Sequence, residues 1–190
     1  YQHCVRAIEH GLRFGARGLP LMGSGDWNDG MNRVGIQGRG ESVWLGFFLY
    51  EILGKFSDLA LRHGDPNFAH SCHDQAERLR RNVEDHGWDG AWYRRAYFDD
   101  GTALGSSANE ECRIDSISQS WSVLSDAADP ARARQAMTSL DRHMVKRDAG
   151  LLQLLDAPFD TTSKDPGYIC AYVPGAAPYT HLTVPTIFSV

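Results

Sequence analysis

Hydrophobic residues recur with a helical period in several segments of this chain. Residues 2–14 carry apolar side chains three or four positions apart, and residues 41–63 are strongly apolar with the same period. Residues 67–86 follow after a short turn that contains glycine and proline. Two helices joined by so short a turn lie antiparallel, so residues 41–86 predict a helical hairpin.

A second pair of helical segments follows at residues 116–127 and 130–145. Asp129 is suited to the N-cap of the second of these helices, and Pro130 to its first helical position. The chain has no glycine-rich βαβ unit, and its strand signals are weak. The pattern therefore predicts an all-α fold built from helical hairpins.

Long irregular segments separate these helices. Residues 15–40 are rich in glycine, and residues 87–115 are rich in glycine, tryptophan, tyrosine and aspartate, with room for a short hairpin. After Gly150 the chain is loop-like. Long ordered loops in compact domains are usually functional. In a ring of helical hairpins the long loops gather on one side, where aromatic rings and polar side chains suit carbohydrate recognition.

Composition narrows the classes of function. The chain has 190 residues, enough for one domain or part of a larger one, and 42% of them are hydrophobic. Its net charge of −5 gives no support for nucleic-acid binding, and the basic run at residues 78–81 fits a solvated helix face. No apolar run is long enough to span a membrane, so we expect no direct membrane contact from this segment.

The residues that commonly bind metals are scattered. The 4 cysteines show no metal-type spacing and are interpreted as reduced thiols, and the 8 histidines are dispersed, most of them on polar helical faces. We therefore predict no metal site and no cofactor. The chain opens on Tyr1 inside a helical pattern, so we expect it to be a fragment of a longer polypeptide.

The least ordinary stretch is GSGDWNDGMN at residues 23–32. A calcium loop of the EF-hand type has its invariant glycine sixth and a bidentate glutamate twelfth. Counted from Asp26, Gly30 is only fifth and the twelfth position holds Gln37. The stretch therefore does not fit an EF-hand.

Asp26 and Asn28 are suited to an Asx-turn, but a turn alone leaves Trp27 unexplained. A carbohydrate site would use the indole ring as a stacking surface. Glycoside cleavage needs one carboxyl group as an acid and usually a second one. Asp26 and Asp29 are too close in sequence to flank one sugar ring, so the second carboxylate lies elsewhere or the nucleophile does not come from the protein.

Four long motifs resemble glycoside hydrolase family 94, the inverting phosphorylases of β-glucosides. They are GLPLMGSGDWNDGMNRVG at 18–35, GRGESVWLGFF at 38–48, WYRRAYFDDGTALGSSANEECRIDSISQSWSVLSDAADPARARQAM at 92–137 and PFDTTSKDPGYI at 158–169. The last two are most similar to the phosphorylase-like domain at the C-terminus of cyclic β-1,2-glucan synthases. The resemblance implies that residues 1–190 are a fragment of an (α/α)6-barrel catalytic domain.

The resemblance also assigns roles. It implies that Asp29 is the general acid and Trp27 a substrate-binding residue. Asp26 and Asn28, which shape the turn, are predicted to belong to the substrate-binding set as well. Inorganic phosphate is then the nucleophile, which accounts for the missing second carboxylate. Because an acid must stay protonated to act, we expect burial against Trp27 to raise the pKa of Asp29.

Further candidates lie downstream. The family's phosphate-binding histidine matches His181, which follows Thr180, although the RENGGQ segment before it is replaced by AAP and the family's sugar-binding glutamate has no counterpart. Gln119 is a candidate for substrate binding. It belongs to a polar group with Asp115 that either caps a helix or lines the sugar cleft.

The expected activity is cleavage of β-1,2-glucan by inverting phosphorolysis to α-glucose 1-phosphate. The expected partners are a β-glucan oligosaccharide, phosphate and the remainder of a larger polypeptide, in the cytoplasm as a domain of an inner-membrane-anchored synthase. Two alternatives stay open. One is an inverting hydrolase that uses water and needs a second carboxylate about 6.5–9.5 Å from Asp29, with Asp115 or Glu111 as candidates. The other is an inactive carbohydrate-binding fragment.

Overall fold

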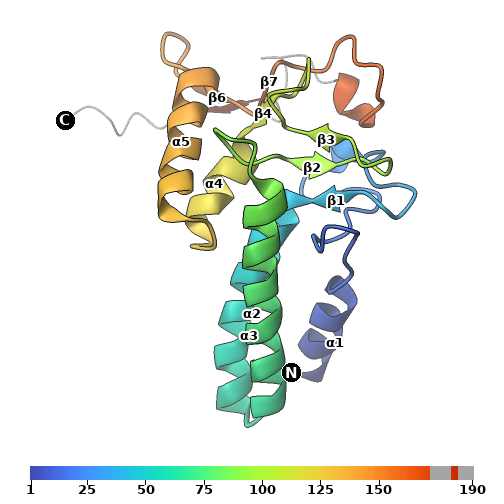
Figure 1. The fold of residues 1–190 in the computed structure, drawn as a ribbon, viewed down its shortest axis with the longest axis vertical. Coiled ribbons are helices and arrows are strands. Elements are labelled where there is room, and N and C mark those ends of the chain that lie inside the picture. The colour runs from blue at the N-terminus through green and yellow to red at the C-terminus, as the bar shows by residue number, and fades with distance from the viewer. Residues whose placement is uncertain (172–180, 184–190) are drawn as a thin grey trace, which may run out of the picture.

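Figure 1 shows the computed structural model, which describes residues 1–171 and 181–183. Its longest feature is the antiparallel hairpin of α2 (Val43–His63) and α3 (Pro66–Asn82), with α1 (Gln2–Gly11) beside it. Apolar residues of all three helices form one core cluster: Ile8, Leu49, Leu53, Cys72, Ala76 and Leu79. The predicted hairpin is confirmed.

The turn of this hairpin follows from its sequence. Gly64 ends α2 with a φ of 82°, in the left-handed region that glycine adopts without a steric penalty. Asp65 then accepts a hydrogen bond from the backbone N–H of Phe68 and caps α3, whose first residue is Pro66. At its other end α3 continues into a short π-helical turn, η2 (Val83–Gly87).

The second hairpin consists of α4 (Ser116–Leu124) and α5 (Pro130–Met144). Asp129 caps α5 through the backbone N–H groups of Ala131 and Arg132, as predicted. In Figure 1 this hairpin lies beside one end of the α2–α3 pair, next to the strands. The regular structure of the described residues is thus mainly helical, and the (α/α)6 barrel remains a prediction.

Short strands connect the helices. In the described residues β1 pairs with β2 and β2 with β3, β4 pairs with β7, and β6 lies between β5 and β8, all antiparallel. Their bounds are β1 Glu41–Ser42, β2 Ala96–Tyr97, β3 Ala103–Leu104, β4 Ile114–Asp115, β5 Val145–Lys146, β6 Leu151–Gln153, β7 Leu155–Asp156 and β8 His181–Thr183. Strands this short leave little alternation in the sequence, which is why the weak strand signals did not reveal them.

The irregular segments share a core of their own. Its buried members come from the first long loop, from β2 and β3, from the residues before β4, and from the segment that runs from β7 to η3 (Tyr168–Ala171): Met22, Met31, Val34, Ala96, Leu104, Cys112, Leu155, Phe159 and Ile169. The loop at residues 23–32, called the DWND loop below, therefore packs against this core. Among the helices that the structure describes, none has the length and hydropathy needed to cross a membrane.

Candidate functional site

The loop at residues 23–32 is built from two successive Asx-turns. Asp26 Oδ1 accepts a hydrogen bond from the backbone N–H of Asn28 at 3.1 Å. Asn28 Oδ1 in turn accepts one from the N–H of Gly30 at 2.9 Å and caps the short 3₁₀ helix η1 (Asp29–Met31). The Asx-turn expected from the sequence is present, and the backbone around Asp29 is tied to both side chains.

Asp26 points into the protein. Nη1 and Nη2 of Arg95 donate to its two carboxylate oxygens at 2.6 and 2.5 Å, and Ser42 Oγ donates to Oδ2 at 2.6 Å. The side chains of Asp26 and Arg95 are both fully buried. Burial by itself raises the pKa of Asp26, but the charge and hydrogen bonds of Arg95 and the other donors outweigh it and lower the pKa below its ordinary value.

A second buried carboxylate faces the same arginine. Asp115 Oδ2 lies 3.5 Å from Arg95 Nε, and Asp115 Oδ1 accepts a hydrogen bond from the N–H of Ile117 at the start of α4. Burial raises the pKa of Asp115 to about 6, although Arg95 acts in the opposite direction. The capping interpretation of Asp115 is confirmed.

Asp29 and Trp27 lie on the outside of the loop. Asp29 is exposed, and 54% of Trp27 is exposed. The expected burial of Asp29 against Trp27 is therefore wrong for the described chain. The reason is the geometry of the turn, which directs the side chain of Asp26 inward to Arg95 and leaves Trp27 and Asp29 on the surface.

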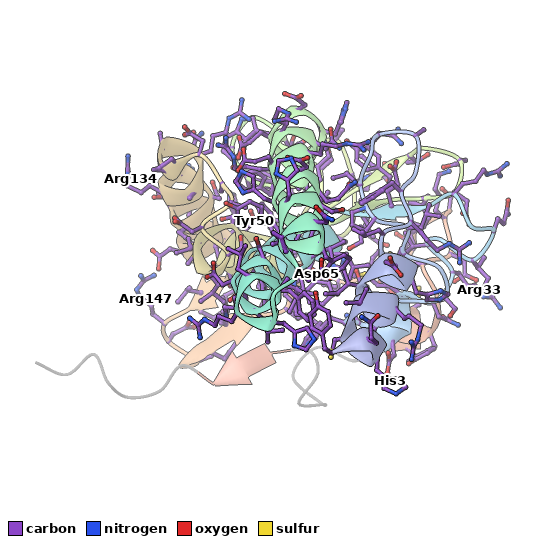
Figure 2. The ribbon with its side chains drawn as sticks, turned by 90° about the horizontal axis from the view of Figure 1, so that it is seen from below. His3, Arg33, Tyr50, Asp65, Arg134 and Arg147 are labelled. Carbon is purple, nitrogen blue, oxygen red and sulfur yellow. The ribbon has the colours of Figure 1, made fainter. Side chains whose placement is uncertain are left out.

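The segment around Gly167 packs against this loop. The carbonyl of Pro166 accepts a hydrogen bond from the N–H of Arg33 at 3.1 Å, and Asn32 Oδ1 accepts one from the N–H of Tyr168 at 3.2 Å. Arg33 also forms an ion pair with Asp165, and Figure 2 labels Arg33 at an edge of the molecule far from Arg134 of α5. Segments more than 130 residues apart thus meet beside η1.

A cavity of about 470 Å³ lies where these segments meet. Polar and charged groups from both segments line it together with backbone: Asn32, Arg33, Thr162, Asp165, Gly167, Tyr168, Cys170 and Ala171. One aromatic side chain, that of Tyr168, is half exposed at its edge. An aromatic ring beside hydrogen-bonding groups is suited to a carbohydrate ligand.

Glu111 binds residues 160–162, which precede the segment around Gly167. Its carboxylate accepts hydrogen bonds from the backbone N–H groups of Asp160, Thr161 and Thr162 at 3.0, 2.6 and 2.9 Å, and from the hydroxyl of Thr161. Burial raises its pKa, but these hydrogen bonds outweigh that effect and the pKa lies below its ordinary value. Glu111 therefore acts as an anchor for the loop.

The other predicted site residues take different positions. Gln119 is fully buried, where its amide accepts from the N–H of Tyr93 and donates to the carbonyls of Tyr93 and Asp115. Thr180 lies outside the described residues. His181 is described only through the backbone of β8, where it pairs with Gln153.

Arg95 and Ser42 are the structural partners that the sequence did not reveal. Both lie inside quoted motifs, WYRRAY and GRGESVW, but neither spacing points to Asp26. The only signal was chemical, because a carboxylate in a glycine-rich turn above a packed core needs a cation if it is buried. This signal does not say which basic residue is the partner, and only the fold identifies Arg95.

Metal-binding groups do not gather in the described part of the chain: no three His, Cys, Asp or Glu side chains there are placed to hold an ion. The four thiols, Cys4, Cys72, Cys112 and Cys170, are free.

Comparison with known proteins gives a consistent result. The family model described as Glycosyl hydrolase 94 superfamily, catalytic domain, matches residues 1–183. The chain is 47% identical over 186 residues, 95% of its length, to the cyclic beta-(1,2)-glucan synthase NdvB of Rhizobium meliloti (strain 1021), of which it covers 7%. It is 33% identical over 187 residues, again 95% of its length, to the solabiose phosphorylase of Paenibacillus borealis, of which it covers 24%.

A third relative is the cellobionic acid phosphorylase of Neurospora crassa, 31% identical over 178 residues, which are 92% of this chain and 22% of that protein. The chain therefore spans less than a quarter of the length of these relatives. The matched segment includes the DWND loop, both helical hairpins and the segment around Gly167. Since the family model covers nearly the whole chain, this protein belongs to the glycosyl hydrolase 94 superfamily, and its residues 1–183 match the catalytic domain of that superfamily.

Proposed function

We propose that this chain provides the acid half of an inverting phosphorylase site for β-glucosides, with Asp29 as the general acid. The observation that carries the proposal is the division within the DWND loop: Asp26 is buried on Arg95, while Asp29 and Trp27 are exposed on a loop fixed from below. Membership in the family and the phosphorylases among its relatives support the same reading.

The chemistry needs one acid and one anion. Phosphate attacks the anomeric carbon of the glucosyl unit while the bond from that carbon to the glycosidic oxygen breaks. Asp29 donates its proton to the departing oxygen, so the products are a shortened glucan and α-glucose 1-phosphate with inverted configuration. Proton transfer of this kind supplies about 10²–10⁴ in rate.

The substrate we favour is a β-1,2-linked glucan, because the relative with 47% identity is named a cyclic beta-(1,2)-glucan synthase. Trp27 would stack on a sugar ring. In this proposal Asp26 and Gln119 serve the substrate indirectly, because their polar atoms are already engaged within the fold, and Asn28 shapes the loop through its Oδ1. His181 and Thr180 are proposed to bind phosphate.

The contacts of Asp115 and Glu111 argue against a hydrolase. A hydrolase needs a second carboxylate that can activate a water molecule opposite Asp29. Asp115 is buried against Arg95, and Glu111 is occupied by three backbone N–H groups and a hydroxyl. Asp115 is shielded from solvent and both oxygens of Glu111 already accept hydrogen bonds, so neither residue is suited to activate a water molecule.

The remainder of the site is proposed to come from the rest of a larger polypeptide. The two hairpins would form part of an (α/α)6 barrel, and the sugar-binding and phosphate-binding groups missing here would come from its other hairpins. We place this domain in the cytoplasm, attached to the inner membrane through other parts of a glucan synthase.

The test is an assay of the complete protein that carries this chain, supplied with β-1,2-gluco-oligosaccharides with and without phosphate. Release of glucose 1-phosphate that depends on phosphate, and that Asp29→Asn abolishes, is the expected result. Asp85→Asn is the matched control, because it makes the same change at an exposed aspartate outside the loop. Glucose released without phosphate would indicate the hydrolase, and binding without turnover an inactive glucan-binding domain.

A further inference from the structure

We infer that Arg95 is a positioning residue: by binding Asp26 inside the protein, it fixes the loop from which Asp29 and Trp27 project. The inference rests on the proposed role of Asp29 and adds a residue that does not itself touch the substrate. It follows from where Arg95 lies, from what its guanidinium group binds and from the short path that joins it to Asp29.

Arg95 lies where separate parts of the chain converge. It directly precedes β2, whereas Ser42 ends β1, Asp115 ends β4 and Asp26 belongs to the DWND loop. Nη1 lies 2.6 Å from Asp26 and 3.3 Å from Ser42 Oγ, Nη2 lies 2.5 Å from Asp26, and Nε lies 3.5 Å from Asp115. The side chain of Arg95 thus joins the DWND loop to the ends of β1 and β4.

The environment of Arg95 leaves it no alternative position. Its side chain is fully buried, and the backbone at Gly105 packs against it so closely that a Cβ atom there would lie 2.5 Å from the N atom of Arg95. A buried guanidinium group must keep its carboxylate partners, because an unpaired charge in the protein interior is strongly unfavourable. The Arg95–Asp26 geometry is therefore a fixed feature of the fold.

Two hydrogen bonds link the Arg95–Asp26 pair to the backbone on either side of Asp29. Oδ1 of Asp26 accepts from Nη2 of Arg95 and from the N–H of Asn28, and Oδ1 of Asn28 accepts from the N–H of Gly30. The backbone of Asp29 lies between Asn28 and Gly30. If Asp26 loses its two-point contact and turns, the support of both Asx-turns is lost and Asp29 is no longer held at one position.

The neighbouring Arg94 provides a matched comparison. It is also largely buried and ion-paired, but its partner is Asp89 at 2.7 Å, and it donates to the carbonyl of His86 and the hydroxyl of Tyr97. None of these groups belongs to the DWND loop. Arg94→Met therefore removes an arginine and its ion pair while leaving the contacts of Asp26 in place.

The experiment compares Arg95→Met, Arg95→Lys and Arg94→Met in the complete protein. Hydrogen exchange at the backbone N–H groups of Asn28 and Gly30 reports the loop directly, without reference to any reaction. Phosphorolysis kinetics then report the effect on Asp29. Since a displacement of about 1 Å can cost roughly 10²-fold in rate, we expect kcat to fall about 10²-fold in Arg95→Met with KM little changed.

We expect exchange at Asn28 and Gly30 to become roughly tenfold faster or more in Arg95→Met and to stay unchanged in Arg94→Met. Arg95→Lys keeps the charge but cannot make the two-point contact, so both readouts should be intermediate. Should Arg95→Met fail to fold, Arg95→Lys and the isosteric Asp26→Asn carry the same test. Unchanged exchange in folded variants, or an equal loss of kcat in Arg94→Met, would overturn the inference.

The two proposals fail in different ways. If Asp29→Asn keeps full activity, the general acid is misassigned, but the exchange measurement still decides whether Arg95 fixes the loop. If Asp29→Asn is inactive while Arg95→Met keeps both kcat and the protection of the loop, the acid is correctly assigned and Arg95 has no positioning role.

Discussion

Asp26 and Arg95 are separated by 69 positions in the sequence and form a two-point ion pair, at 2.5 and 2.6 Å, that solvent does not reach. Asp29 belongs to the same loop and is exposed. The two aspartates of DWND are therefore not equivalent. One connects the loop to the core, and the other is available to a substrate.

This difference predicts that substitutions of Asp26 and Asp29 have unequal effects on stability. Asp26→Ala removes the two-point partner of Arg95 and leaves this buried charge only its longer contact with Asp115, so the free energy of unfolding should fall by about 3–5 kcal/mol. Asp29→Asn changes an exposed side chain, and the free energy of unfolding should stay within about 0.5 kcal/mol. Urea unfolding of the two variants measures both effects, and equal losses would contradict the structure.

Asp115 predicts a dependence of stability on pH. Its pKa is raised from 3.8 to about 6 in the folded protein, so folding favours its protonated form. The stabilisation from this group is complete below pH 3.8 and is lost as the pH rises through about 6, by up to about 3 kcal/mol. Asp115→Asn should remove this step and keep the cap on Ile117.

The measurement is the difference in free energy of unfolding between Asp115→Asn and wild type, followed from pH 4 to pH 7. We expect the difference to move in favour of the variant as the pH rises, whereas Asp85→Asn shows no such change relative to wild type. A difference that stays constant over this range would show that Asp115 titrates near its ordinary pKa.

The structure predicts that position 167 tolerates no side chain. Its φ is 121°, and a Cβ atom there would lie 2.5 Å from the carbonyl oxygen of Gly30. Gly150 also has a positive φ, of 64°, but a Cβ atom there would meet no other described atom within 4 Å. Gly150→Ala should therefore cost only about 1–2 kcal/mol of backbone strain.

Gly167→Ala should cost about 1–3 kcal/mol more than Gly150→Ala, because the segment at residues 165–171 must move away from η1. Limited proteolysis should then cut residues 165–171 faster in Gly167→Ala than in wild type, and not faster in Gly150→Ala. Equal stabilities and equal cleavage rates would mean that the two segments do not pack as described.

Glu111 predicts a local effect. Glu111→Gln keeps one acceptor oxygen and loses the charge, so the backbone N–H groups of residues 160–162 lose part of their support, worth about 1–2 kcal/mol. Hydrogen exchange of these residues should accelerate, while Glu110→Gln, at an exposed neighbour, leaves it unchanged. The pKa of Glu111 is lowered, so wild type should lose the same protection only as the pH falls below the ordinary value for glutamate.

The sequence predicts the helical part of this fold well because periodicity and capping are local. The turn at Gly64 and the caps of α3 and α5 lie where the residues indicate. Helix ends are less certain: α1 ends at Gly11, ahead of the expected residue 14, because the apolar periodicity continues past the glycine that ends the helix.

The site was predictable only in part, because its geometry depends on distant contacts. The spacing of Asp26 and Asp29 does not state which one points inward, since that is decided by Arg95. Gln119 resembles a ligand-binding amide in the sequence, yet its partners are backbone groups of Tyr93 that only the fold brings near. Such pairings carry no local signal.

The most direct test of the proposed site is the rate of phosphate-dependent release of glucose 1-phosphate by the complete protein and by its Asp29→Asn variant. If Asp29 is the general acid, the variant should be folded and about 10²–10⁴-fold slower, and Asp85→Asn should match wild type. Wild-type rates in Asp29→Asn, or glucose released equally without phosphate, would contradict the account.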